Sequence, residues 1–267
     1  MLSVIIINFK NSPLLRLCLK TLTNVLDPNF SREITVVDIA STVETRNVIS
    51  EFSDVKLISF KENIGYTRGV NESIRVNQGD AFLILNPDVI ILKDSVEKMY
   101  EYLKQNRQIG IIGPQLLNFD GIPQSSFFRF PSPWTLIYRR TFWGKISFGK
   151  KHLDRFTMKD LGRVKFHEAD WLMGSAIMVS RQAVEKVGLM DERFFLYMSD
   201  IDWPRRFWEN GYTVVYYPEA KMYHYHQRES RGRLGALDFL FKKESRWHLI
   251  DAVKYFKKYG IRSKSFS

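Results

Sequence analysis

Short apolar runs rich in β-branched residues recur along the first half of the chain and alternate with longer stretches of helical periodicity. Continuous runs of this kind are typical of strands that are buried on both faces of a parallel sheet. The alternation therefore predicts βαβ units and an α/β fold. The predicted strands are Val4–Ile7, Ile34–Val37, Val55–Ser59, Ala81–Leu85 and Ile109–Ile112, and the clearest helices are Pro13–Leu26 and Ser95–Gln105.

The pattern changes near residue 120. Asp120-Gly121 is a turn signal, and the two prolines within Phe130–Trp134 disfavour a helix there. No regular structure is predicted from that loop to Lys165. Beyond it the sequence predicts a strand at Trp171–Ser180, helices at Gln182–Val187 and Asp200–Asn210, the second ended by Gly211, a strand at Thr213–Tyr217, and a long amphipathic helix at Leu234–Tyr259.

Composition excludes several classes of protein. Hydrophobic residues make up 45% of the chain and aromatic residues 14%, which is too apolar for an intrinsically disordered protein. No stretch approaches the roughly 18 to 20 apolar residues of a membrane-spanning helix, and Met1–Asn8 has the pattern of a buried strand and not of a signal peptide. The single cysteine, Cys18, cannot form an internal disulfide, so we expect a cytoplasmic protein.

The net charge of +11 is concentrated in two segments. Residues 121–165 hold ten basic and two acidic side chains, residues 226–267 hold eleven and four, and the remainder is mildly acidic. Both segments are also rich in aromatic residues, a composition suited to an anionic membrane surface. A single-stranded nucleic-acid platform and an ordinary solvated basic face are the alternatives. No nucleic-acid-reading motif is present, so nucleic acid is not an expected partner.

Polar residues follow several of the predicted strands, at the edge where open α/β sheets bind ligands. They are Asn8, Asp38, Asn63 and the tripeptide Asn86-Pro87-Asp88. Each alone is typical of a turn, but together they indicate one shared crevice. The Asp88 carboxylate could hold Mg²⁺ or Mn²⁺ against a diphosphate there, because hard cations prefer oxygen ligands.

A second group of candidates lies around the helix predicted from Asp200. Asp200 could act as a general base on an incoming hydroxyl. Asp202 could have a functional role, or could cap the helix or pair with Arg205 or Arg206. His224 could return a metal ligand to the crevice, or could simply be a packed histidine.

In order and spacing, these motifs resemble the family-2 glycosyltransferases with a GT-A fold, and among them the rhamnosyltransferase-like subgroup that builds bacterial cell-surface polysaccharides. The resemblance extends over residues 3–230. Its segments are Ser3–Phe9, Val36–Thr42, Glu62–Asn71, Leu85–Asp88, Trp171–Ser175, Asp191–Tyr197 with Asp200-Ile-Asp202, and Gly211-Tyr212 with Pro218 and His224.

The resemblance implies a mixed, mostly parallel sheet flanked by helices and the following division of the chain. Residues 1–230 would form the catalytic domain, with a nucleotide-binding half at 1–118 and an acceptor-binding half at 119–230 that includes the basic aromatic insertion 121–165. Residues 231–267 would form a C-terminal basic amphipathic helix.

The resemblance also implies roles for individual residues. Asp200 matches the catalytic base, and Asp88 with His224 match ligands of Mg²⁺ or Mn²⁺. The positions that match the nucleotide-sugar site are Asn8, Asp38, Asn63, Gly65, Asn71, Asn86 and Asp88. Those that match the donor-sugar or acceptor site are Trp171, Gly174 and Asp202.

The implied activity is transfer of a sugar, with inversion, to a glycan or to a polyprenyl-diphosphate-linked glycan. The expected donor is dTDP-rhamnose, which supplies rhamnose. Such a hexosyltransferase would work in the cytoplasm or on the inner face of the plasma membrane. Three positions depart from the family pattern. Asn86 replaces the first aspartate of the metal motif, as is common in this subgroup. Ser199 replaces an acidic residue, and Ile39 replaces an asparagine. They keep open the alternative of a non-catalytic peripheral membrane or glycan-binding protein that retains the fold.

Overall fold

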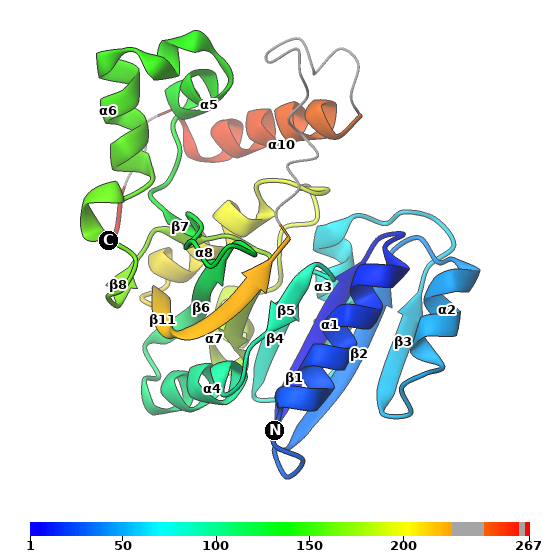
Figure 1. Ribbon diagram of the computed structural model, residues 1–267. Coiled ribbons are helices and arrows are strands. Elements are labelled where there is room, and N and C mark those ends of the chain that lie inside the picture. The colour runs from blue at the N-terminus through cyan, green and yellow to red at the C-terminus, as the bar shows by residue number, and fades with distance from the viewer. Residues whose placement is uncertain (226–242, 262–264) are drawn as a thin grey trace.

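The computed structural model describes residues 1–225, 243–261 and 265–267. Within them, a nine-stranded sheet has the strand order β3-β2-β1-β4-β10-β6-β11-β5, and β8 pairs with β11 (Figure 1). Its strands are β1 (Leu2–Asn8), β2 (Arg32–Asp38), β3 (Val55–Ser59), β4 (Ala81–Leu85), β5 (Val89–Ile91), β6 (Ile109–Leu117), β8 (His167–Glu168), β10 (Ala176–Ser180) and β11 (Thr213–His224). A separate two-stranded sheet joins β7 (Phe127–Phe128) to β9 (Trp171–Leu172).

The sheet is mixed and mostly parallel, as expected. Strands β3, β2, β1 and β4 pair in parallel, as do β6 and β11. Strand β10 lies antiparallel between β4 and β6, and β5 is antiparallel to β11 at the edge. All five strands predicted from apolar runs in the first half are confirmed, and β1 is buried along its whole length.

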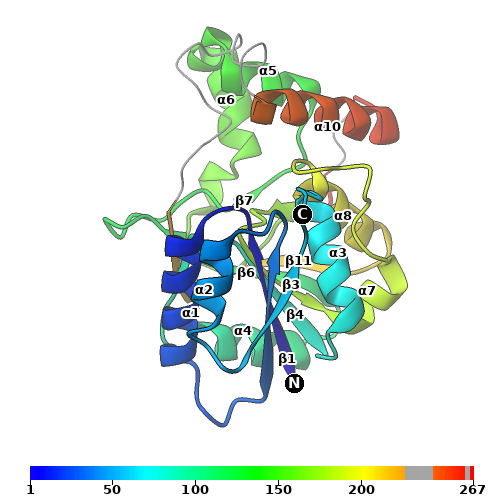
Figure 2. The same cartoon turned by 90° about the vertical axis from the view of Figure 1, so that its right-hand side faces the viewer.

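Helices cover both faces of the sheet, and each face has its own hydrophobic core. On one face α1 (Ser12–Val25), α2 (Val43–Ile49) and α4 (Ser95–Gln105) pack through residues such as Leu19, Val48 and Met99. On the other face α3 (Tyr66–Val76), α7 (Arg181–Val187) and α8 (Ser199–Glu209) pack through residues such as Val70 and Trp203 (Figure 2). The continuous apolar strands predicted this two-sided burial.

A lobe of three helices lies beyond the carboxyl ends of the parallel strands (Figures 1 and 2). It comprises α5 (Pro133–Arg140), α6 (Ser147–Phe156) and α10 (Lys243–Tyr259), with short 3₁₀ turns at Phe142–Lys145 and Lys159–Leu161. A third apolar cluster, which includes Phe128, Trp171, Ile201 and Tyr255, connects this lobe to the sheet domain. The part of the long C-terminal helix predicted before α10, and the domain boundary predicted at 230/231, lie outside the described residues.

Several expectations need correction. The strand predicted at Thr213–Tyr217 continues past Pro218 to His224 as β11, and α6 forms in the stretch before Lys165 where the sequence predicts no regular structure. The strand predicted over Trp171–Ser180 is broken into β9 and β10 by a turn at 173–175, where the backbone N–H of Met173 bonds to Ser126 O over 2.8 Å. A helix also begins inside the proline-rich loop, because Pro133 occupies the first helical position, where a missing N–H is tolerated, and Ser132 forms a capping box with Thr135.

None of the described helices is long and apolar enough to cross a bilayer.

Candidate active site

Two polar side chains lie together where neighbouring strands β1 and β2 end. Asn8 and Asp38 are paired in register and are completely buried. Asn8 Nδ2 donates to Asp38 Oδ1 over 3.0 Å and to Thr45 Oγ1 over 3.2 Å, while the Thr42 N–H donates to Asp38 Oδ2 over 3.3 Å. The strand register thus builds a connected polar cluster at the ligand-binding edge of the sheet.

Three further predicted nucleotide-site residues lie in α3 or just before it. Asn63 Oδ1 accepts a hydrogen bond from the Gly65 N–H over 2.9 Å. Gly65 has φ of +83°, and a Cβ there would lie 2.6 Å from the carbonyl oxygen of Phe195, so this close approach requires glycine. The buried Asn71 side chain bonds to both the N–H and the carbonyl of Met190, over 3.0 and 2.9 Å. These residues tie α3 to the segment that precedes α8.

Asp88 and His224 face one another across the antiparallel pair β5–β11. The Nε2 atom of His224 lies 3.6 Å from Asp88 Oδ2, and the imidazole is 6% exposed. Gln124 donates through Nε2 to the His224 carbonyl over 2.8 Å and to Asn118 Oδ1 over 2.9 Å, so its Oε1 faces His224 Nδ1, 2.9 Å away. In the neutral imidazole this arrangement places the hydrogen on Nδ1 and turns the Nε2 lone pair towards Asp88.

A carboxylate oxygen and an imidazole nitrogen 3.6 Å apart are a suitable donor pair for a divalent transition-metal cation. No group of three or more His, Cys, Asp or Glu side chains that could hold a metal occurs among residues 1–225, 243–261 and 265–267. Substrate and water could supply further ligands to a cation held by Asp88 and His224. Magnesium and manganese sites on nucleotide phosphates are commonly completed in this way.

The turn at 173–175 connects this pair to Asp200. The Asn86 N–H donates to Ser175 O over 2.8 Å, which fixes the start of the Asn86-Pro87-Asp88 segment against the turn. One residue earlier, a Cβ on Gly174 would lie 3.1 Å from Asp200 Cβ. The break in the predicted strand therefore brings the end of β4 and the start of α8 to the same turn.

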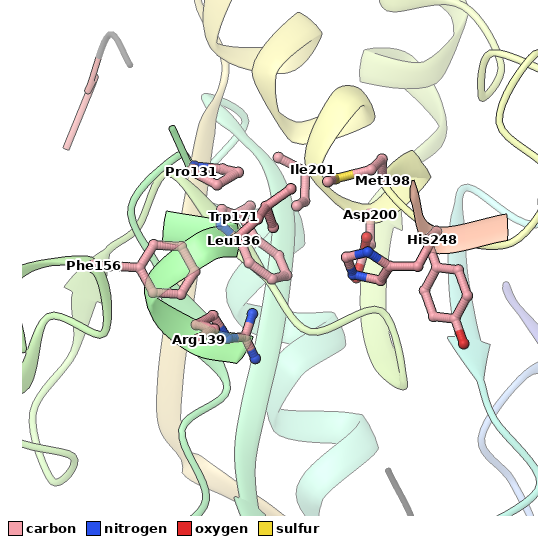
Figure 3. Close-up of a pocket in the computed structure, with 10 residues that line it drawn as sticks. Pro131, Leu136, Arg139, Phe156, Trp171, Met198, Asp200, Ile201 and His248 are labelled. Carbon is pink, nitrogen blue, oxygen red and sulfur yellow. The ribbon is translucent and has the colours of Figure 1, made fainter. Parts of the chain in front are cut away.

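Asp200 lies in a pocket between the sheet domain and the helical lobe (Figure 3). It is the second residue of α8, so this helix begins one residue earlier than predicted. The pocket is lined by the sheet domain and by all three helices of the lobe: Pro131, Leu136, Arg139, Phe156, Trp171, Tyr197, Met198, Asp200, Ile201 and His248. The side chain that could serve as a base thus faces a partly open space lined by both apolar and charged or polar side chains.

Burial raises the pKa of Asp200 from 3.8 to about 6, because removal from water disfavours the charged carboxylate. The backbone amides of Asp200 and Gly174 and the nearby charge of Arg139 oppose this rise. His248 responds in the opposite direction: burial, with the charges of Arg140 and Arg139, lowers its pKa to about 4. Near neutral pH the pocket therefore holds an ionised carboxylate of raised basicity beside a neutral imidazole.

The two remaining residues predicted for the donor-sugar or acceptor site lie in different surroundings. Trp171 lines the pocket, donates through Nε1 to Arg129 O over 2.9 Å, and stacks on Phe128. Asp202 is completely buried and bonds to Arg206 Nε over 3.0 Å, Lys258 Nζ over 2.6 Å and Tyr259 Oη over 2.8 Å. Among the interpretations of Asp202 that the sequence leaves open, these contacts favour the ion pair with Arg206.

Sequence reasoning missed three residues of the site. Gln124 lies in a stretch without periodicity, and nothing there indicated that it orients His224. Arg139 was noted only as part of a basic segment. His248 carried no motif and reaches the pocket from the C-terminal helix.

Comparisons with curated proteins find relatives described as a hexosyltransferase and as rhamnosyltransferases. A low-salt glycan biosynthesis hexosyltransferase, Agl10 of Haloferax volcanii, is 29% identical over 205 residues, which cover 75% of this chain and 59% of that protein. An N-acetylglucosaminyl-diphospho-decaprenol L-rhamnosyltransferase of Mycobacterium tuberculosis is 26% identical over 261 residues, 87% of this chain and 78% of that protein. The rhamnosyltransferase WbbL of Escherichia coli K12 is 25% identical, with 73% of this chain and 68% of that protein covered. The chain thus spans less than two thirds of the length of the Haloferax relative.

Solved structures share the fold. GalNAc-T7 with UDP, GalNAc and Mn²⁺ superposes with a TM-score of 0.65 at 14% identity, covering 84% of this chain and 43% of that one. The mannosyltransferase PcManGT of Pyrobaculum calidifontis with GDP-Man and Mn²⁺ gives 0.64 at 15% identity, covering 99% and 65%. The fold is therefore the GT-A fold expected above. The family described as "Glycosyl transferase family 2" matches residues 3–188, more than half of the sequence, and the chain belongs to that family.

Proposed function

We propose that this protein is an inverting glycosyltransferase that moves a sugar from a nucleoside-diphosphate donor to a hydroxyl group of a glycan acceptor. The observation that carries the proposal is Asp200: an aspartate with a pKa of about 6 in a pocket between the ligand-binding edge of the sheet and a helical lobe. A general base works best when its pKa is near the working pH, and burial has raised this one towards neutrality.

In this proposal Asp200 removes the proton from the acceptor hydroxyl while that oxygen forms its bond to the anomeric carbon. The bond from that carbon to the diphosphate oxygen breaks on the opposite face, so the configuration inverts and the nucleoside diphosphate carries away the electron pair. The proton remains on the Asp200 carboxyl group until it passes to solvent. Trp171 and the backbone of Gly174 border the space where donor sugar and acceptor would meet.

The donor would occupy the crevice at the ends of β1, β2 and β4. Asn8 and Asp38 would line the base and ribose, and Asp88 with His224 would hold Mg²⁺ or Mn²⁺ against the diphosphate. When bound, such a cation would neutralise negative charge on the leaving group. The Mn²⁺ and nucleotides present in the GalNAc-T7 and PcManGT structures support this assignment.

We further propose rhamnose from dTDP-rhamnose as the donor sugar and a polyprenyl-diphosphate-linked glycan as the acceptor. The support is the similarity to rhamnosyltransferases of three bacteria. The name of the Mycobacterium tuberculosis protein includes a decaprenol-linked sugar, and RfbF of Shigella flexneri is described as a dTDP-rhamnosyl transferase. The catalytic unit would comprise residues 1–230, followed by the C-terminal amphipathic segment.

An acceptor anchored in lipid would require the pocket to lie near a membrane, and the helical lobe has a suitable surface. Its exposed apolar side chains in and between α5 and α6 are Trp134, Ile137, Phe142, Trp143 and Phe148. Exposed cations accompany them at Lys145, Lys150 and Lys151. Aromatic and basic side chains together favour the interface of an anionic bilayer, which supports the proposal that the protein works on the inner face of the plasma membrane.

Transfer assays on purified protein test the function. The parent protein should release nucleoside diphosphate from dTDP-rhamnose only with a polyprenyl-diphosphate-linked acceptor and a divalent cation. Asp200→Asn should lower turnover by about 10² to 10⁴-fold, with the donor dissociation constant nearly unchanged. Asp154→Asn is a matched control, because Asp154 lies in α6 away from the pocket and its carboxylate forms an exposed ion pair with Lys159 over 3.4 Å.

A folded parent protein that binds glycan but transfers no sugar from dTDP-, UDP- or GDP-linked donors would favour the non-catalytic alternative. Unchanged turnover in Asp200→Asn would remove Asp200 from the mechanism.

A further inference from the structure

The backbone at 195–197, just before α8, directs three consecutive N–H groups at a single atom. That atom is Oδ2 of Asp251, on α10, which accepts from Phe195 over 3.1 Å, from Leu196 over 3.2 Å and from Tyr197 over 3.1 Å. Asp251 is 1% exposed. Consecutive amides that converge in this way form an anion-binding nest, and here the chain fills the nest with its own carboxylate.

Further contacts of α10 hold the same segment on both sides of the candidate base. Lys254 bonds to Asp251 Oδ1 over 3.1 Å and to the Arg193 carbonyl over 2.6 Å, before the nest. Beyond the base, Lys258 bonds to Asp202 Oδ1 over 2.6 Å. Helix α10 is therefore attached by charge-assisted hydrogen bonds to the loop that enters α8 and to the first turn of that helix.

The backbone between the nest and the base has little freedom to adjust by itself. Asp200 is three residues beyond Tyr197, and the intervening Met198 has φ of +65°, in the left-handed region that few non-glycine residues adopt. A conformation of this kind persists when the surrounding structure imposes it. The three bonds to Asp251 fix the backbone immediately before this residue.

We propose that Asp251 is a positioning residue that sets the place and the burial of Asp200. It does not touch substrate; it holds the loop so that the Asp200 carboxylate faces the acceptor hydroxyl. The proposal rests on the proposed function, in which Asp200 is the base. Asp251 lies on α10, outside residues 3–188 that match the family, so the family match does not include it.

Kinetics of Asp251→Ala and Asp251→Asn test the positioning role, with Asp154→Asn as the control. Displacement of a catalytic group by about 1 Å can cost on the order of 100-fold in rate. We therefore expect kcat to fall by about 10 to 100-fold, most in the alanine variant, with the donor dissociation constant within about twofold of the parent. Unchanged kcat in a folded variant, or a loss confined to donor binding, would overturn the proposal.

The pH profile provides a readout that a purely structural role would not move. If the loop opens, water reaches Asp200 and its pKa falls towards the ordinary value for aspartate. The acidic limb of kcat in Asp251→Asn should then shift to lower pH. An acidic limb at the parent position would show that Asp251 does not set the burial of the base.

Hydrogen exchange separates this inference from the proposed function. The amides of 195–197 should exchange at least about tenfold faster in Asp251→Ala, while those of the central strands stay protected. Unchanged exchange at 195–197 would show that Asp251 does not hold these amides. If the parent protein transfers no sugar but Asp251→Ala still exchanges faster at 195–197, Asp251 holds this backbone. The proposed function and the positioning role would then both be overturned.

Discussion

Replacing Asp200 with asparagine should make the protein more stable at neutral pH while it abolishes most turnover. The folded pKa of about 6 exceeds the ordinary 3.8, so the folded state binds the proton more tightly than the unfolded state does. The stability contributed by the protonated form is complete at low pH and is lost as pH rises from 3.8 through 6. Asparagine resembles the protonated carboxyl group and does not ionise, so the variant avoids this loss.

The magnitude follows from the two pKa values of Asp200. Ionisation in the folded pocket costs about 3 kcal/mol at pH 7 but only about 0.5 kcal/mol at pH 4. The carboxylate is half-buried, and solvent screening reduces the neutral-pH figure to about 1 to 2 kcal/mol. For a chain of this size that gain corresponds to a rise in Tm of roughly 2 to 6 °C.

Urea denaturation followed by circular dichroism, at pH 7 and at pH 4, measures the effect. The difference between Asp200→Asn and the parent should be clear at pH 7 and small at pH 4, and Asp154→Asn should show no comparable gain. An equal gain at both pH values, or a loss at pH 7, would refute the reasoning that burial of a charged Asp200 strains the folded state.

Three further predictions concern other parts of the molecule. Gln124→Leu removes the hydrogen bond that orients His224, so the affinity for Mn²⁺ in the presence of a nucleoside diphosphate should fall about 10 to 100-fold by calorimetry; equal affinity would contradict the orienting role. Asp202→Asn should lower the free energy of unfolding by about 3 kcal/mol, because its cationic partners lose a buried carboxylate. If activity were lost without loss of stability, Asp202 would instead be a substrate contact. Replacing both Trp134 and Phe142 with serine should reduce co-sedimentation with anionic vesicles about tenfold and leave turnover on a soluble acceptor intact. Equal recovery of both proteins with the vesicles would exclude this surface as the membrane contact.

The sheet could be predicted because its information is local. Apolar runs such as Val4–Ile7 and Ala81–Leu85 identify buried strands by themselves, and polar residues directly after them mark one edge. The break at 173–175 could not be predicted, since Trp171–Ser180 is apolar enough for one strand and the turn is fixed by a contact to Ser126. Helix α5 is a different case, because its start is marked locally by Pro133 at the first helical position and by the Ser132–Thr135 capping box. The expectation there is wrong because proline disrupts a helix only beyond its first turn.

The residues that hold the candidate site in place could not be predicted from the sequence. Their partners are far away in the chain or are backbone groups that any residue could supply. Asp251 binds backbone amides more than fifty residues earlier in the chain, and any sequence could supply those amides. Gln124 meets His224 across a separation of 100 residues. Only the fold brings such pairs together.

The third apolar cluster also has a consequence for synthesis of the chain on the ribosome. The two cores on the faces of the sheet are built from residues up to Met222, so this part can condense while the remainder is still being made. The cluster behind the pocket needs Ala252 and Tyr255 as well. A nascent chain therefore carries every family motif before it has a finished pocket, and the candidate base reaches its final surroundings only after α10 has been synthesised and has docked.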